Sequence, residues 1–240
     1  MSEAPAPAST GTAAAEPVAR SPITPAPPVV VQAGWEVSGR RSTAALTLTD
    51  CTPLVKIQVK IQVRAQVKAG HGGALADLLG AGFGRAARDR AGALVVGSGP
   101  GEWLALAGPG TADALRERLA AGLAGMSGTE GFVSVVDLTH GRALVRLSGM
   151  QAGDVLAKVC GIDLRDGVTP HGSALRTSVA GLVTDLVRDD RGGTRGGTLS
   201  YLLHCERSSG QYLFEALIDA GEQFGIDVDG FRPPESSWGT

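Results

Sequence analysis

The feature that most constrains the fold is a run of strict alternation, KIQVKIQVRAQVK, at residues 56–68. Apolar side chains occupy every second position, and lysine, arginine or glutamine fills the positions between them. Successive side chains of a β-strand point to opposite faces, so a period of two indicates a strand. The sequence therefore predicts one long strand with a buried face and a solvated face.

The rest of the chain alternates between short helical and short strand patterns. Helices are expected near 72–82, after Thr111, at 151–161 and at about 209–224, and strands at 93–97, 102–107, 132–138, 142–149, 174–179, 181–188 and 199–205. The order strand–helix–strand–strand–helix occurs twice, at about 54–138 and 139–226. This order predicts an α+β fold, with helices packed on antiparallel sheets, and a divergent internal duplication.

Both ends of the chain have the composition of unfolded segments. Residues 1–33 carry seven of the thirteen prolines and almost no large apolar side chain before Val29. Such a segment buries too little apolar surface to offset its loss of conformational entropy. We therefore expect a disordered tail at 1–33, a single α+β domain at 34–230 and a frayed end at 231–240.

Composition argues against several classes of protein. The net charge is −2 and only ten residues are aromatic, whereas a nucleic-acid-binding face is basic and often carries stacking aromatics. No apolar run approaches the ~20 residues that cross a bilayer, and the N-terminal MSEAPAPAST lacks the regions of a secretory signal. Three scattered cysteines make no disulfide framework. We expect neither nucleic acid nor a membrane as a partner, and a reducing cytoplasm as the compartment.

The glycine-rich stretch GSGPG at residues 97–101 could be a phosphate-binding loop or a hairpin turn. A dinucleotide loop needs G-x-G-x-x-G between a strand and a helix. Here Gly97, Gly99 and Gly101 fall at every second position, and Glu102 stands where the last glycine of the motif would be. The apolar residues that follow read as a strand. We therefore favour a β-hairpin turn.

No catalytic, cofactor-binding or metal-binding constellation is evident. The chain has no C-x-x-C and no G-x-S-x-G motif, and metal-ligand spacing is missing from its four histidines, His71, His140, His171 and His204. His204 and Cys205 are neighbours on a predicted strand, so they point to opposite faces and cannot form a dyad. Cys205 is expected to be buried and inert, and all three cysteines are expected to be dispensable for chemistry.

Two polar segments allow a functional and a structural interpretation. Asp137 and His140 flank the turn DLTHGR and could form an acid–base pair, but we favour an Asx or ST turn at a strand end. The segment RDDRGGTRGG at 188–197 could contact a partner, although a solvated hairpin loop is the default for such a composition. Neither segment predicts a catalytic residue.

Five segments occur in an order that is typical of one protein family. They are GPGEWLAL (99–106), VVDLTHGRALVRLSG (135–149), LAKVCGIDL (156–164), RTSVAGLVTDLVR (176–188) and ERSSGQYLFEAL (206–217). Together they resemble the gamma subunit of heterotetrameric sarcosine oxidase, over roughly residues 54–226. The chain departs from that family at Gly101, where an acidic residue is usual, and at Ser209-Gly210, where Phe-Ala is usual.

The resemblance implies a fold similar to the folate-binding domain of the glycine-cleavage aminomethyltransferase. It implies as partners the alpha, beta and delta subunits of a complex that oxidises sarcosine to glycine, reduces oxygen to peroxide and passes the one-carbon unit to tetrahydrofolate. It also implies that FAD, FMN, NAD, tetrahydrofolate and zinc are held by those other subunits, and that this chain is a non-catalytic subunit without a cofactor.

For such a subunit we expect the notable residues to be structural or at interfaces. Trp103 is expected in the core or at a subunit contact, since exposing it would forgo about 2–3 kcal/mol of burial. Contact surfaces are expected at 133–138, at 142–148 and on the last helix. The full set of candidates is Trp103, Glu102, Asp137, His140, Arg142 and Phe224.

A stand-alone folate-binding or aminomethyl-transferring protein is the alternative function. It would need a carboxylate to orient the pterin and the amine. Asp137 and Asp185 are the acidic residues that the sequence places near strand ends. Folate binding by the isolated chain would distinguish this alternative from a non-catalytic subunit.

Overall fold

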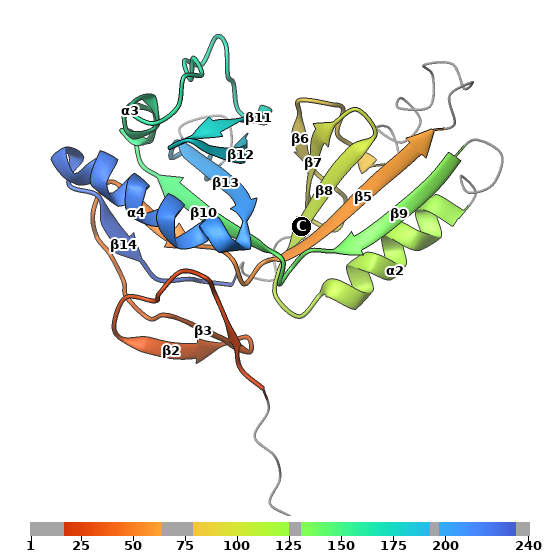
Figure 1. Ribbon diagram of the computed structural model, residues 1–240, viewed down its shortest axis with the longest axis horizontal. Coiled ribbons are helices and arrows are strands. Elements are labelled where there is room, and N and C mark those ends of the chain that lie inside the picture. The colour runs from red at the N-terminus through yellow and green to blue at the C-terminus, as the bar shows by residue number, and fades with distance from the viewer. Residues whose placement is uncertain (1–16, 64–78, 125–130, 193–196, 234–240) are drawn as a thin grey trace, which may run out of the picture.

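The computed structural model describes residues 17–63, 79–124, 131–192 and 197–233. This part of the chain forms two large sheets and one small sheet, and helices lie on the outer faces of both large sheets (Figure 1). Most of the expected helix near 72–82 and the far end of the alternating run, 64–68, lie outside the described residues.

The five-stranded sheet contains the alternating run as its long strand. Its antiparallel strands, in order across the sheet, are β6 (Ala86–Arg88), β7 (Leu94–Gly99), β8 (Glu102–Ala107), β5 (Val55–Val63) and β9 (Gly131–Asp137). Helix α2 (Ala112–Leu123) covers the outer face and buries three leucines against Ile57 and Val59 of β5. Those leucines, Leu115, Leu119 and Leu123, are spaced by four residues, as one face of an amphipathic helix requires.

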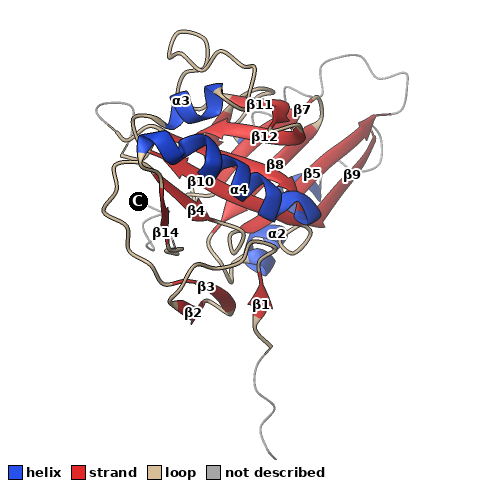
Figure 2. Ribbon diagram, turned by 60° about the vertical axis from the view of Figure 1, so that its left-hand side comes forward, coloured by secondary structure: helices blue, strands red, loops and turns tan. Residues whose placement is uncertain are grey.

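The six-stranded sheet is built from the second half of the chain and two strands that the sequence did not reveal. Its order is β11 (Ala174–Val179), β12 (Leu182–Arg188), β13 (Ser200–Glu206), β10 (Arg142–Ser148), β4 (Thr47–Asp50) and β14 (Asp227–Asp229), antiparallel except for β4 and β14. Helices α3 (Ala152–Ala157) and α4 (Gly210–Gly221) lie over its outer face (Figure 2). Strands as short as β4 and β14 show no clear period. In the described residues, no helix is long and apolar enough to span a bilayer.

The two large sheets pack their inner faces against each other. This inner layer includes Leu94, Val96, Leu104 and Leu106 from the five-stranded sheet, and Leu144, Ala174, Val187 and Leu202 from the six-stranded sheet. Strands β7 and β8 are therefore covered on both faces, which explains why they read as continuous apolar runs instead of alternating ones.

Strand β5 departs from the expected pattern at its start. Lys56 lies on the face predicted to be solvated, yet it is completely buried, because its neighbour Leu106 on β8 packs in the inner layer. Its Nζ donates hydrogen bonds to the carbonyl oxygens of Thr52 and Leu54, at 2.7 and 2.8 Å. Burial lowers the pKa of Lys56 to about 7. Lys60, on the same face, is exposed as expected.

Because of Lys56, we expect the free energy of unfolding to rise with pH between pH 7 and 8.5. The unfolded chain keeps a proton on this lysine up to about pH 10.5, whereas the folded chain loses it near pH 7. The slope contributed is up to about 1.4 kcal/mol per pH unit. Urea unfolding at several pH values measures it.

Lys56→Met should remove this slope, and Lys60→Met should keep it. The window stops at pH 8.5 because burial raises the pKa of Cys51 and of Cys205 to about 11, which lowers stability at higher pH. An identical slope in wild type and Lys56→Met would contradict the account.

The glycine-rich stretch is a hairpin turn, as the sequence predicted. Strands β7 and β8 pair antiparallel on either side of it, with a register shift between Gly97 and Gly99. Gly101 has a φ of +71°, which a residue with a Cβ adopts only with strain. A Cβ on Gly97 would lie 2.1 Å from the carbonyl oxygen of Gly82. The glycines therefore permit the turn and a close backbone approach.

Trp103→Ala is expected to lower the free energy of unfolding by about 3–5 kcal/mol, the usual cost for a buried aromatic. The indole is 3% exposed, and its Nε1 donates a hydrogen bond of 2.8 Å to the carbonyl oxygen of Ala81. Trp103→Phe keeps an aromatic ring in the core and should cost less. Chemical denaturation measures both variants, and a neutral Trp103→Ala would argue against a core role.

The expected disorder of residues 1–33 is wrong for residues 17–33. Strand β3 (Trp35–Ser38) pairs parallel with β1 (Ala19–Arg20) and antiparallel with β2 (Val29–Gln32) to form the small sheet. Ile23 is buried in the core of the six-stranded sheet. Pro22 packs so closely that a Cβ on Gly210 would lie 2.9 Å from its ring. The glycine at 210 therefore makes room for this N-terminal segment, whose burial its composition did not reveal.

Candidate functional site

A cavity of about 630 Å³ lies between the two large sheets, beside the C-terminal segment. Its polar lining includes Thr49, Arg88, Arg146, His171, Asp189, Asp190, Arg191, Asp229 and Arg232, and its apolar lining Cys51, Leu54, Ala86, Ala87, Leu94 and Phe231. Phe231 is buried, so the expected frayed end at 231–240 is wrong for Phe231; residues 234–240 lie outside the described part. The volume is within the range of small-molecule sites.

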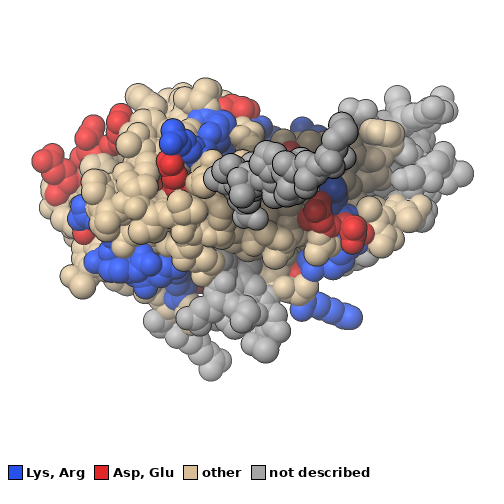
Figure 3. Space-filling model, turned by 90° about the horizontal axis from the view of Figure 1, so that it is seen from below, with Lys and Arg blue, Asp and Glu red and all other residues tan. Residues whose placement is uncertain are grey.

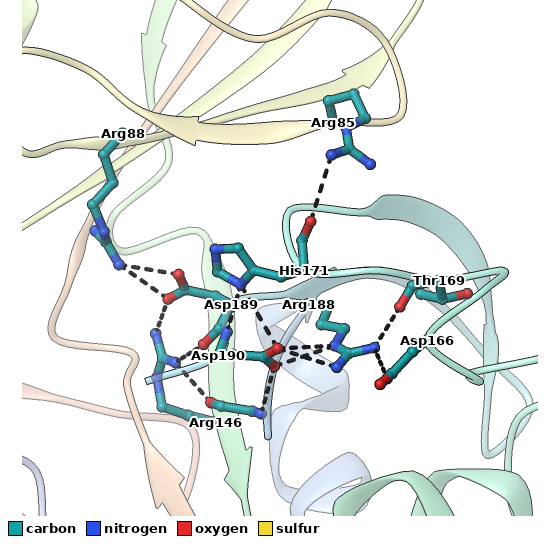
Figure 4. A network of polar contacts seen from close by, with 10 residues as sticks. Arg85, Arg88, Arg146, Asp166, Thr169, His171, Arg188, Asp189 and Asp190 are labelled. Carbon is teal, nitrogen blue, oxygen red and sulfur yellow. Dashed lines mark hydrogen bonds and ion pairs between the residues drawn. The ribbon is translucent and has the colours of Figure 1, made fainter. Parts of the chain in front are cut away.

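The central charge of the cavity wall is the carboxylate of Asp189. It accepts a hydrogen bond of 2.6 Å from Nη2 of Arg146 and bonds of 3.1 Å from Arg88 (Figure 4). Arg146 lies on β10 and Arg88 on β6, so this carboxylate joins the two sheets. Burial alone would raise the pKa of Asp189, but the charges of Arg146 and Arg88 outweigh it and hold the pKa below its usual value.

A second set of ion pairs lies behind the first. Arg188 is buried and pairs with Asp190 and Asp166, and its Nη1 donates to the carbonyl oxygen of Thr169 at 2.7 Å (Figure 4). The Nδ1 of His171 accepts a hydrogen bond of 3.0 Å from the backbone N–H of Asp190. The segment 188–197, expected to be a solvated loop, therefore begins with buried charges; its residues 193–196 lie outside the described part.

Asp189→Asn is expected to destabilise the fold by about 3–5 kcal/mol, because removing one partner of a buried ion pair leaves the other charge uncompensated. The side chains of Asp189 and Arg146 are 7% and 9% exposed. Asp166→Asn is the control, since Asp166 is 88% exposed and exposed pairs contribute at most about 1 kcal/mol. Thermal and urea unfolding compare the two, and equal losses would contradict the assignment.

A separate polar cluster bridges the sheets at Glu102. Arg176 of β11 donates to Glu102 at 3.1 Å and to Asp185 at 2.7 Å, and Nδ1 of His204 lies 3.2 Å from Asp185. Gln58 donates to Glu102 at 2.8 Å. Burial alone would raise the pKa of Asp185, but hydrogen bonds from His204 and Arg176 hold it below its usual value. The sequence had named Glu102 and Asp185 without placing them together.

An Asp–His pair such as Asp185–His204 can form a general base, but this histidine is not accessible from the cavity. His204 is 5% exposed, does not line the cavity, and its Nε2 has no hydrogen-bond partner among the described residues. Burial lowers the pKa of His204 despite the carboxylate beside it. Cys205 points to the opposite face, into the helix-covered core, as predicted. The pair joins neighbouring strands β12 and β13, and Arg176 links its carboxylate to Glu102 of the other sheet.

The remaining sequence candidates are scattered. Asp137 accepts a hydrogen bond of 2.8 Å from the backbone N–H of Thr139, which is the Asx turn that we favoured. His140 stacks on Trp35, with ring centroids 4.8 Å apart. Arg142 pairs with Glu206. Phe224 is partly buried, with Nζ of Lys158 5.7 Å from the centre of its ring.

Strand β10 corrects one expected contact surface, 142–148. It is buried between β13 and β4 from Ala143 onward, so only Arg142 reaches solvent. Residues 133–138 fit better, because β9 is an edge strand that leaves Phe132 and Val136 exposed. On the face seen in Figure 3, basic and acidic side chains form small separate groups, and neither sign covers the surface.

Sequence reasoning missed the cavity residues Arg88, Arg146, Asp189 and Arg191. One signal was available: Arg146 interrupts the apolar strand ALVRLSG at a position that should face inward. Within the described residues, no group of three or more His, Cys, Asp or Glu side chains could hold a metal ion. The three cysteines are free and buried, and the burial of Cys205 agrees with the prediction.

Comparison with known proteins confirms the predicted resemblance. The chain matches one chain of heterotetrameric sarcosine oxidase from Corynebacterium sp. U-96, in a complex with pyrrole 2-carboxylate, at 26% identity and a TM-score of 0.58. The match covers 78% of this chain and 89% of that one. No protein-family model and no curated protein matches the sequence.

The fold is also that of a glycine-cleavage aminomethyltransferase. The enzyme from Bartonella henselae matches with a TM-score of 0.58 at 17% identity, over 84% of this chain. The match spans 55% of the length of that enzyme. At this identity the likeness is one of fold alone, and it agrees with the mixed α+β architecture that the sequence predicted.

Proposed function

We propose that this chain is a non-catalytic, gamma-type subunit of a flavin-dependent heterotetrameric sarcosine oxidase. The observation that carries the proposal is the similarity at 26% identity over 89% of one chain of such an oxidase. A match of this extent pairs two chains nearly end to end, as expected for equivalent subunits. The five sequence segments that resemble the gamma subunit support the same assignment.

The state of the reactive side chains supports a non-catalytic role. In the described residues, the carboxylates of Glu102, Asp185 and Asp189 each accept hydrogen bonds from arginines. Burial raises the pKa of Cys51 and Cys205 to about 11, so both thiols are protonated at neutral pH. A buried thiol that stays protonated is inert as a nucleophile, which agrees with a non-catalytic role of the cysteines.

The partners in this proposal are the alpha, beta and delta subunits. FAD, FMN, NAD, tetrahydrofolate and zinc would be held by those chains, and the assembled complex would oxidise sarcosine to glycine. Edge strand β9 is the proposed contact surface, with Phe132 and Val136 exposed by 66% and 44% on the face away from α2. Exposed apolar side chains on a sheet edge favour burial against another chain.

The shared strand order supports a duplicated origin of the subunit. The order β6-β7-β8-β5 in one sheet corresponds to β11-β12-β13-β10 in the other, counted along each half of the chain. We propose that the halves 54–138 and 139–226 are divergent copies of one unit. The copies differ in their last strand, which is β9 in the first sheet and the separate strand β4 in the second.

Co-expression with the other three chains tests the subunit assignment. We expect this chain to elute with them in gel filtration, in one peak with flavin absorbance, and to be required for a stable active complex. Alone it should be colourless and inactive towards sarcosine. A chain that purifies alone and demethylates sarcosine by itself would refute the proposal.

A matched pair of variants makes this experiment sharper. Phe132→Glu places a charge on the proposed contact and should release the chain from the complex. Met150→Glu is the control, because Met150 is exposed by 78% but lies outside β9. If both variants elute with the complex, the contact lies elsewhere on the subunit.

The alternative is a stand-alone folate-binding or aminomethyl-transferring protein. The cavity of about 630 Å³ is the observation that favours it, together with the aminomethyltransferase fold. Titration of the purified chain with tetrahydrofolate, followed by calorimetry, tests it. Binding in the micromolar range without other subunits would support the alternative.

A further inference from the structure

We propose that the cavity between the two sheets is a binding site for a small monoanionic carboxylate with an apolar body, and that Arg191 binds the carboxylate. This site goes beyond the subunit role and does not depend on it. The inference rests on the charges of the cavity wall, on the position of Arg191 and on the apolar part of the lining.

One arginine of the cavity wall has no carboxylate partner within the described part of the chain. Its lining contains four arginines, Arg88, Arg146, Arg191 and Arg232, and three aspartates, Asp189, Asp190 and Asp229. Arg88 and Arg146 share Asp189, Arg232 pairs with Asp229, and Asp190 pairs with Arg188 behind the wall. Among the described residues, the Arg191 guanidinium has no hydrogen-bond or ion-pair partner.

The position of Arg191 suits a ligand that enters from solvent. It is exposed and lines the cavity, directly after the buried Asp189 and the partly buried Asp190. Arg191 and the buried Cys51 line the same cavity, so the guanidinium belongs to the wall that a ligand would contact. A guanidinium presents a planar fork of donors that matches a carboxylate.

The other residues of the lining indicate the polarity and the total charge of the ligand. Leu54, Leu94 and Phe231 are each at most 4% exposed and form an apolar surface inside the cavity. The other lining arginines already pair with aspartates, so a second negative charge on the ligand would find no free cation in the described wall. One anionic group on an apolar body therefore fits better than phosphate or a dicarboxylate.

Titration of the full chain with benzoate, benzamide and phthalate tests the proposal by calorimetry or by chemical-shift perturbation. These probes share a ring and differ in charge. We expect benzoate to bind about tenfold more tightly than neutral benzamide and dianionic phthalate, since a charge-assisted hydrogen bond contributes about a factor of ten or more. Arg191→Gln should reduce benzoate affinity about tenfold, to the level of benzamide.

Two further variants serve as controls. Arg191→Lys keeps the charge without the fork and should retain part of the benzoate affinity. Arg116→Gln removes an exposed arginine of α2 that lies outside the cavity, and it should bind benzoate like wild type. If the chain purifies only with partner chains, the same comparison is made in the complex, with the variants in this chain alone.

Three results would overturn the proposal: equal affinity for benzoate and benzamide, no binding of benzoate at 50-fold ligand excess and millimolar concentration, or unchanged affinity in Arg191→Gln. None of them bears on subunit assembly. Conversely, a chain that fails to assemble with the oxidase subunits could still bind benzoate through Arg191, so the two proposals fail separately.

Discussion

The contact between the inner faces of the two large sheets is the constraint on which the rest of the molecule depends. Its apolar layer is formed mainly by β7, β8, β10, β12 and β13. At one border the layer gives way to Asp189 with its two arginines, and at another to the cluster of Glu102, Arg176 and Asp185. Some polar residues on the strands of this contact are buried as well, and Lys56 is completely buried among them.

These polar borders also fix how the sheets are aligned. The Asp189 carboxylate receives guanidinium groups from both sheets, and a shift of one sheet would separate it from Arg88 while Arg146 stayed paired. An apolar layer alone tolerates such shifts better, because dispersion contacts have little directionality. We therefore infer that packing supplies most of the stability and that the ion pairs select the arrangement.

The same arrangement places the exposed edge strand β9 and the cavity in different parts of the molecule. Helices cover the outer faces of the large sheets, and each inner face covers the other, so edge strands such as β9 remain for contact with another chain. The cavity opens elsewhere, between β6, β10 and the C-terminal segment. A ligand at Arg191 and a partner at Phe132 would thus be bound by different parts of the chain.

The sequence by itself determined the local elements. The period of two in β5, the glycines of the hairpin and the spacing of Leu115, Leu119 and Leu123 depend on neighbouring residues, so they can be read directly. The five sequence segments, in their order along the chain, also indicated the resemblance to sarcosine oxidase. Only the tertiary structure decided that Ile23 is buried, that Lys56 loses its solvent and that Arg88, Arg146 and Asp189 meet. Burial and pairing depend on which faces come together, and residues far apart in the chain determine that jointly.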